Sequence, residues 1–134
     1  MRNEREVRLR EALRDLAVLV IGGDPRAHHT TRLRIQLGLG EVIHCATRKS
    51  DPTADCFRAA LRNSHLVLVI CARGLCRTQH AKALHGFCRR FGWPLLDCNH
   101  IPHPNAVIGA LLEKELDKSV LCRSVEVRSL GGAA

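Results

Sequence analysis

Short apolar segments alternate with longer amphipathic segments along most of the chain. Residues Ala17 to Ile21 are continuously apolar and are followed by Gly22-Gly23. Such a segment, short, β-branched and closed by glycine, predicts a strand that is buried on both faces. Three further segments of this kind predict strands at Val42 to Cys45, Leu66 to Ile70 and Leu95 to Asp97.

The segments outside these strands carry apolar residues at helical spacing. An opening amphipathic helix from Asn3 to Leu16 is expected to place Val7, Leu9, Leu13 and Leu16 on one side. A final edge strand is expected at Val120 to Val127. Further helices are predicted at Thr30 to Leu37, Asp51 to Arg62, Thr78 to Phe91 and Asn105 to Leu116.

Alternating strands and helices with short connections require parallel strands and right-handed crossovers. The predicted fold class is therefore α/β, with a three-layer open parallel sheet of four or five strands, Rossmann-like or flavodoxin-like. A chain of 134 residues is the size of one domain. We expect an N-terminal helix at residues 1–16, a single α/β domain at 17–128 and a disordered tail at 129–134.

The charge of the chain favours an anionic ligand. The formal net charge is +8, and most of the basic residues are arginines, whose planar guanidinium suits phosphates and carboxylates. The basic residues are spread along the chain, and aromatic residues make up only 3% of it. Because single-stranded nucleic acid is bound largely by stacking on aromatic rings, a small anion is favoured over nucleic acid, which the charge still permits.

The cellular compartment is predicted from the N-terminus and the cysteines. The first residues are rich in Arg and Glu and contain no apolar segment of the kind found in signal peptides. No apolar segment is long enough to cross a bilayer, and the seven cysteines are an odd number. We therefore expect a cytoplasmic, cysteine-rich, basic protein with reduced thiols and no membrane partner.

Ligands of open parallel sheets bind outside the carboxyl ends of the strands. In this chain the segments at those ends are Gly22 to His29, His44 to Lys49, Cys71 to His80 and Asp97 to His103. Of the eight His and seven Cys residues, ten lie in these segments: His28, His29, His44, Cys45, Cys71, Cys76, His80, Cys98, His100 and His103. We expect the working site along this edge.

Two kinds of ligand fit these residues. Imidazole and thiolate bind zinc, iron, copper and haem iron, so a transition metal or haem is one predicted cofactor. Its predicted ligands are His29, His44, Cys45, Cys71, Cys76 and His80. A small anion is the other, with predicted contacts from Gly22, Gly23, Arg73 and Arg77. Surface His and buried Cys at strand ends are also common without any ligand, so a structural role stays open.

A specific chemical pattern follows the most apolar strand. Cys71 is separated by five residues from Arg77, and Thr78 then opens a predicted helix. A thiolate there would be stabilised by loop amides and the helix N-terminus. The segment resembles the active loop of low-molecular-weight tyrosine phosphatases and arsenate reductases. The resemblance implies Cys71 as nucleophile, Arg77 as phosphate clamp and Thr78 as the hydroxyl that steadies the thiolate. Asp97 is then the candidate general acid.

A broader similarity covers Ala17 to about Leu116. It rests on Gly22-Gly23 after the first strand, His29 four residues before Leu33-Arg34, His44 at the end of the second strand, Cys88, and Gly92-Trp93-Pro94. In these positions the chain resembles the bacterial family of domains of unknown function called DUF2325. The resemblance implies a Rossmann-like fold with His side chains directed at one crevice, and it gives no established reaction.

Three functional hypotheses follow from the sequence. The first is a small ligand-binding or sensing domain that holds a metal, haem or anionic ligand at the carboxyl edge of the sheet. The second is a Cys-dependent phosphatase or arsenate reductase that uses Cys71 and Arg77. The third is a protein-interaction domain, in which the helix from Asn3 to Leu16 docks a partner or a second copy in a homodimer. Whether the chain is an enzyme stays open at this point.

Overall fold

The computed structural model describes residues 4–22, 27–45, 65–72, 78–98 and 102–132; for residues 27, 28, 78–81, 91 and 130–132 it describes the backbone alone. The helix predicted at Asp51 to Arg62 lies outside these ranges. The described elements, in chain order, are α1 (Glu4–Leu13), β1 (Ala17–Ile21), α2 (Ala27–Leu37), β2 (Glu41–Cys45), β3 (Leu66–Ala72), α4 (Thr78–Phe91), β4 (Leu95–Cys98), α5 (Pro104–Glu113) and α6 (Asp117–Gly132).

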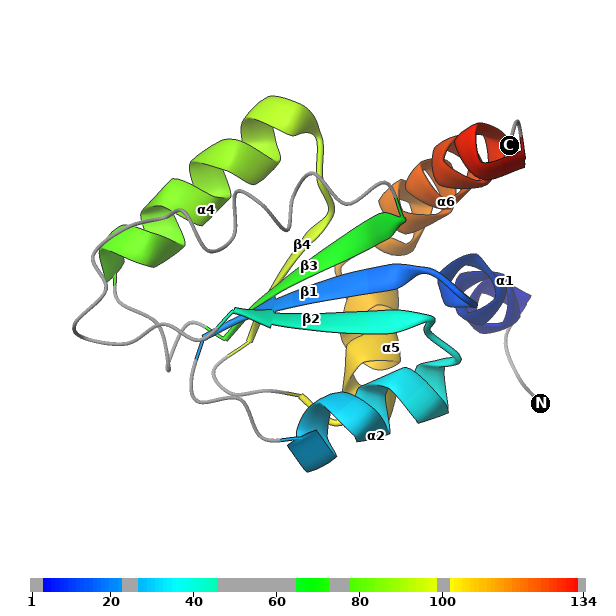
Figure 1. The fold of residues 1–134 in the computed structure, drawn as a ribbon. Coiled ribbons are helices and arrows are strands. Elements are labelled where there is room, and N and C mark those ends of the chain that lie inside the picture. Colours follow the sequence, from blue (N-terminus) through cyan, green and yellow to red (C-terminus); the bar gives the residue numbers. More distant parts are fainter. Residues whose placement is uncertain (1–3, 23–26, 46–64, 73–77, 99–101, 133–134) are drawn as a thin grey trace.

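The described strands form one parallel sheet in the order β2-β1-β3-β4 (Figure 1). All residues of the two central strands, β1 and β3, are buried. Continuous burial explains why both strands are made of apolar residues rather than of alternating apolar and polar ones. The predicted α/β fold class with an open parallel sheet is confirmed.

Helices cover both faces of the sheet and produce three layers (Figure 1). Successive side chains of a strand point to opposite faces, so β1 contributes to two separate cores. On one face Leu19 and Ile21 pack in a cluster with Leu84 of α4. On the other face Val18 and Val20 belong to the cluster that contains the buried residues of α1, α2, α5 and α6. The sheet is therefore enclosed on both sides by this chain itself.

The first helix is shorter than predicted and buries a different side. It ends at Leu13, and its buried residues are Leu9, Ala12 and Leu13. Val7, which we expected on the buried side, is 38% exposed. The reason is geometric: with 3.6 residues per turn, Val7 lies about 200° around the helix from Leu9. The apolar side of α1 packs in the core of its own chain, so it does not offer that side to a partner.

The edge strand predicted at Val120 to Val127 is wrong, because these residues belong to helix α6. Its buried residues Val120, Ser124 and Val127 recur at helical spacing, and this packing outweighs the strand preference of valine. The helix continues to Gly132, so residues 129–132 are helical where we expected a disordered tail. Although α6 has 16 residues, no helix in the described part of the chain is both long and apolar enough to cross a membrane.

An ion pair fixes α1 to the first turn of α6. The guanidinium of Arg5 donates to both carboxylate oxygens of Asp117, at 2.9 and 3.2 Å, and the Asp117 side chain is only 3% exposed. The hydrogen bond from Arg5 lowers the pKa of Asp117 below its usual value, although burial acts in the opposite direction. At the other end of α1, Arg128 donates to the backbone oxygens of Glu11 and Arg14. Helices far apart in the sequence are thus tied together at two points.

Replacing Asp117 with Asn should make the stability of the protein less dependent on pH. A carboxylate whose pKa is lowered by folding stabilises the protein above its unfolded pKa of about 4, and this stabilisation is lost as the pH falls through the lower folded pKa. We therefore expect Asp117→Asn to lower the urea midpoint at neutral pH and to differ less from the wild type as the pH falls below about 4.

Glu113→Gln is the matched control. It makes the same carboxylate-to-amide change at an exposed position close to Asp117 in the sequence. Its urea midpoint should follow that of the wild type at each pH. A deficit of Asp117→Asn that stays constant over the whole pH range would contradict the assigned role of the ion pair.

Candidate functional site

The strand order places a topological switch point between β1 and β3. From β1 the chain proceeds to β2 on one side, whereas β3 and β4 lie on the other side. Ile21, the last residue of β1, is paired with Cys71 near the end of β3. Connections that leave two neighbouring strands in opposite directions open a crevice between them at the carboxyl edge. The predicted site segments therefore begin around this crevice.

Gly22 lies at the centre of this edge and joins three strands. Its amide donates to the backbone oxygen of Cys45 at 3.0 Å, and its φ angle is +120°. A Cβ atom on Gly22 would lie 2.8 Å from the backbone oxygen of Ala72. A side chain at this position would therefore be both strained and in collision with the end of β3. The glycine predicted from the sequence is required here by close approach of two backbones.

His44 also contacts Gly22. Its Nε2 atom lies 2.8 Å from the Gly22 backbone oxygen, and because a carbonyl oxygen only accepts, Nε2 must carry the hydrogen. The second ring nitrogen, Nδ1, is then the proton acceptor of the neutral ring. This Nδ1 atom is buried and has no hydrogen-bond partner in the part of the chain that the structure describes. A buried acceptor without a partner is costly, so it favours a ligand that can donate a hydrogen bond at this position.

Two helices begin at this edge. Helix α2 follows β1 and α4 follows β3, and neither has an acidic residue in its first turn. No carboxylate within these first turns therefore offsets the positive ends of the two helix dipoles. His29 lies in the first turn of α2, one turn before the buried Leu33, and its Nδ1 atom is buried. The edge thus gathers groups that attract an anion.

The sheet separates the predicted metal ligands. His44 and Cys45 are consecutive in β2, so their side chains point to opposite faces, and Cys45 packs in the α4-side cluster. Cys71 packs in the same cluster, but Ile21 of β1 lies between the two cysteines in the register. Two strand spacings amount to about 10 Å, whereas two thiolates on one zinc ion lie within roughly 4 Å. Cys45 and Cys71 therefore do not share one metal ion.

No group of three or more His, Cys, Asp or Glu side chains in the described ranges is arranged to hold a metal ion. The side chains of Cys76 and His80, which complete the predicted metal set, lie outside the described part, as do Gly23, Arg73 and Arg77 of the anion set. No disulfide joins the cysteines within the described ranges. Of the predicted ligands, the structure brings Gly22 and His44 into contact and keeps Cys45 and Cys71 apart.

The α4 face holds a second group of reactive side chains. Asp97 of β4 is the register partner of Cys71, so both side chains leave the sheet on the same side. The Nε2 atom of His85 lies 3.0 Å from an Asp97 carboxylate oxygen. Cys88 lies one turn farther along α4, and burial together with the charge of Asp97 raises its pKa to about 12. Cys88 is therefore a neutral thiol at physiological pH.

His85 is the residue that the sequence analysis missed. Leu84 and Cys88 are buried at helical spacing on α4, and His85 lies beside them at the border of the buried face. Asp97 alternates with the buried Leu96 on β4 and must face α4. Helical and strand periodicity together place His85 and Asp97 on facing surfaces. The two patterns could have indicated the pair only with the order of the strands known.

The phosphatase-like segment is described at its two ends. Cys71 belongs to β3, one residue farther into the strand than predicted, and its side chain is completely buried. Thr78 is the first residue of α4. The segment therefore spans a strand end and a helix start, as its resemblance implies, but the thiol is covered. A nucleophile must be accessible to its substrate, so burial of Cys71 weighs against this role.

Two other predicted site residues have a structural explanation. His103 is the N-cap of α5, and its Nδ1 atom accepts a hydrogen bond from the backbone amide of Asn105 at 3.2 Å. Cys98 is half-buried at the end of β4, and burial raises its pKa. Neither residue needs a ligand to account for its position.

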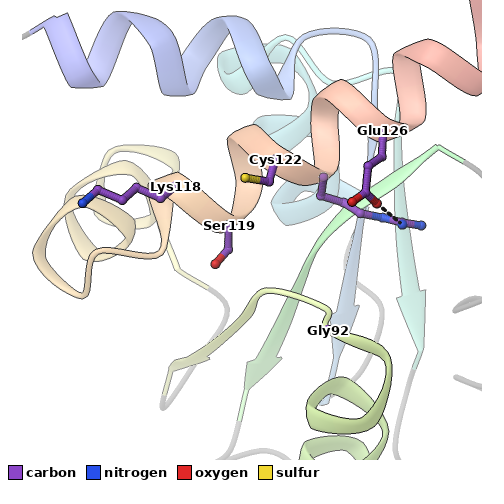
Figure 2. A pocket seen from close by; sticks show the side chains of 6 residues that line it. Gly92, Lys118, Ser119, Cys122 and Glu126 are labelled. Atoms are coloured by element: carbon purple, nitrogen blue, oxygen red, sulfur yellow. Dashed lines mark hydrogen bonds and ion pairs between the residues drawn. The ribbon is translucent and has the colours of Figure 1, made fainter.

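A hollow of about 360 Å³ lies at the opposite edge of the sheet, beside Gly92 and α6 (Figure 2). Its arginine, Arg123, is already occupied: it pairs with Glu126 at 3.1 Å, donates to the Leu66 backbone oxygen and stacks over Trp93 at 4.0 Å. In Figure 2 the Lys118 side chain points away from Glu126. These groups do not converge on one point, so this hollow is not the candidate site.

Comparison with protein-family models, curated proteins and solved structures finds no match for this chain. The resemblances to DUF2325 and to the phosphatase loop therefore stay predictions.

Replacing Gly22 with Ala should destabilise the protein by about 2 to 4 kcal/mol, because the new Cβ meets the Ala72 backbone at an unfavourable φ. Gly86→Ala is the matched control. Gly86 lies within α4 with no atom within 4 Å of an added Cβ, so the change should stabilise the helix by about 0.5 to 1 kcal/mol. Urea unfolding measures both. Equal stability of Gly22→Ala and wild type would contradict the packing of Gly22 against β3.

Proposed function

We propose that the chain is a small ligand-binding domain that holds an anion in the crevice between the carboxyl ends of β1 and β3. The observation that carries the proposal is the strand order β2-β1-β3-β4, which reverses between these two strands. Open parallel sheets bind their ligands at this point. Gly22, which tolerates no side chain, holds the ends of β1 and β3 close together at this point.

The charge of the edge supports an anion. Helices α2 and α4 begin here without acidic residues in their first turns. Arg73 and Arg77, placed by the sequence between β3 and α4, would add guanidinium groups. His44 would contribute its buried Nδ1 atom as an acceptor for a hydroxyl group of a partly protonated anion. A metal or haem is less supported, because Cys45 and Cys71 are two strands apart.

Inorganic pyrophosphate is a suitable probe, titrated into the protein at constant ionic strength while amide chemical shifts are recorded. We expect saturable shifts at Gly22 and in the first turns of α2 and α4. Arg77→Gln should weaken binding about tenfold, the loss expected for one charge-assisted hydrogen bond. Arg89→Gln, at the far end of α4, should leave it unchanged.

Unsaturated shifts spread over exposed arginines would contradict the proposal, since they indicate general charge attraction. Elemental analysis and an absorption spectrum of the freshly purified protein test the other ligands. Stoichiometric metal or a haem spectrum would replace the anion by a metal-binding function.

A Cys-dependent phosphatase or arsenate reductase is a second proposal, and one specific observation favours it. Asp97 is the register neighbour of Cys71 and faces the same side of the sheet. In this reaction the Cys71 sulfur would form a bond to phosphorus while the bond to the leaving oxygen breaks, and Asp97 would give that oxygen a proton. His85, paired with Asp97, would orient the carboxyl group. The Cys71 thiol would first have to be uncovered.

Turnover of p-nitrophenyl phosphate distinguishes this proposal from pure binding. If it holds, Cys71→Ser should lower kcat at least about a thousandfold, because oxygen at this position is a much poorer nucleophile. Cys88→Ser should keep the wild-type rate, since Cys88 is a neutral thiol with a pKa of about 12. A protein that binds pyrophosphate and turns over no aryl phosphate is a binding domain.

A further inference from the structure

A second surface lies at the amino edge of the sheet, opposite the carboxyl edge that holds the candidate site. It is a groove of about 380 Å³ between α1 and the last turn of α2. The two helices meet there, since the Asp15 amide donates to the Gly38 backbone oxygen at 2.8 Å. Val7 and Ile35 line this groove, at 38% and 64% exposure. Among the described residues only Val125 is another exposed large apolar side chain. Two exposed apolar residues in one groove favour a binding surface.

Two charged side chains in this groove have no side-chain partner within the described ranges. On α1, Arg8 pairs with Glu4 and Arg10 pairs with Glu6. The side chains of Glu11 and Arg14, which also line the groove, take part in no ion pair or hydrogen bond within the described ranges. One acidic and one basic group are therefore available side by side.

We infer that this groove is the interface of a homodimer in which the α1 helices of two copies lie antiparallel. A two-fold axis at the level between Ala12 and Leu13 places Glu11 of each copy opposite Arg14 of the other. Self-complementary pairing of this kind is what a two-fold interface requires. An acidic partner protein would leave Glu11 facing like charge, so a second copy of this chain fits the groove better.

The same arrangement covers the apolar residues. Val7 and Ile35 line one groove with Glu11 and Arg14, so a second copy that pairs with these two charges also lies against both apolar side chains.

The expected dimer is weak and sensitive to salt. Few residues line the groove, and each copy carries a formal charge of +8, so the copies repel at long range. At physiological ionic strength the screening length is about 8 Å, which removes most of this repulsion and leaves the local contacts. The carboxyl edge stays free in this arrangement, so dimer formation and anion binding are independent.

Sedimentation equilibrium, from about 1 µM to about 1 mM protein at physiological salt, tests the inference. We expect a reversible monomer–dimer equilibrium. Ile35→Glu should weaken it at least tenfold, whereas Val125→Glu, which places the same charge on an equally exposed valine of α6, should not change it. Far-UV circular dichroism and urea unfolding confirm that the variants fold.

A charge exchange tests the antiparallel geometry. Glu11→Arg alone should weaken the dimer, because the new arginine of each copy then faces Arg14 of the other copy. Glu11→Arg combined with Arg14→Glu should restore it, because opposite charges face each other again. A protein that is monomeric at every concentration overturns the inference, and so does a dimer that responds equally to Ile35→Glu and Val125→Glu. A dimer that the double variant does not restore overturns the antiparallel arrangement.

Discussion

The burial of β1 and β3 on both faces is the constraint on which the rest of the structure depends. Every residue of these strands is buried, so each face of the sheet must be covered by helices. One face is covered by α4, and the other by helices from both ends of the chain. The Arg5–Asp117 ion pair joins α1 to α6, two of the helices in that second layer.

The same two strands decide where chemistry can occur. Their neighbours β2 and β4 lie on opposite sides, so the topological switch point falls between β1 and β3 at the carboxyl edge. Strand alternation then sorts the candidate residues by face: His44 faces away from Cys45, and Asp97 faces the same way as Cys71. The His and Cys residues that the sequence places at one edge of the sheet are therefore divided between its two faces. This separation is why the anion proposal has more support than a metal site.

The two edges of the sheet differ in character. The carboxyl edge begins two helices, lacks acidic residues in their first turns and requires a glycine at its centre. The amino edge carries the groove between α1 and α2, lined by the exposed Val7 and Ile35 and by Glu11 and Arg14, whose side chains make no ion pair within the described ranges. Because the edges lie at opposite ends of rigid, buried strands, a ligand at one edge and a second copy at the other can be bound at the same time.

The sequence by itself determined the elements whose signal is local. The apolar segment from Ala17 to Ile21 and the amphipathic segment from Thr78 to Phe91 have the predicted bounds, because continuous burial and helical spacing are visible in neighbouring residues. The parallel sheet followed from their alternation, whereas a site at its carboxyl edge stays a prediction. The strand predicted at Val120 to Val127 is wrong, because the strand preference of valine is local whereas the surface on which α6 packs is distant in the sequence.

Only the tertiary structure decided the order of the strands and the partners of each side chain. The contact of His44 with Gly22, the pairing of His85 with Asp97 and the separation of Cys45 from Cys71 all depend on which strands are neighbours. Residues far apart along the chain meet only through that order, and no local pattern carries it. The physical reason is that hydrophobic spacing specifies which face of an element is buried, but not the element against which it is buried.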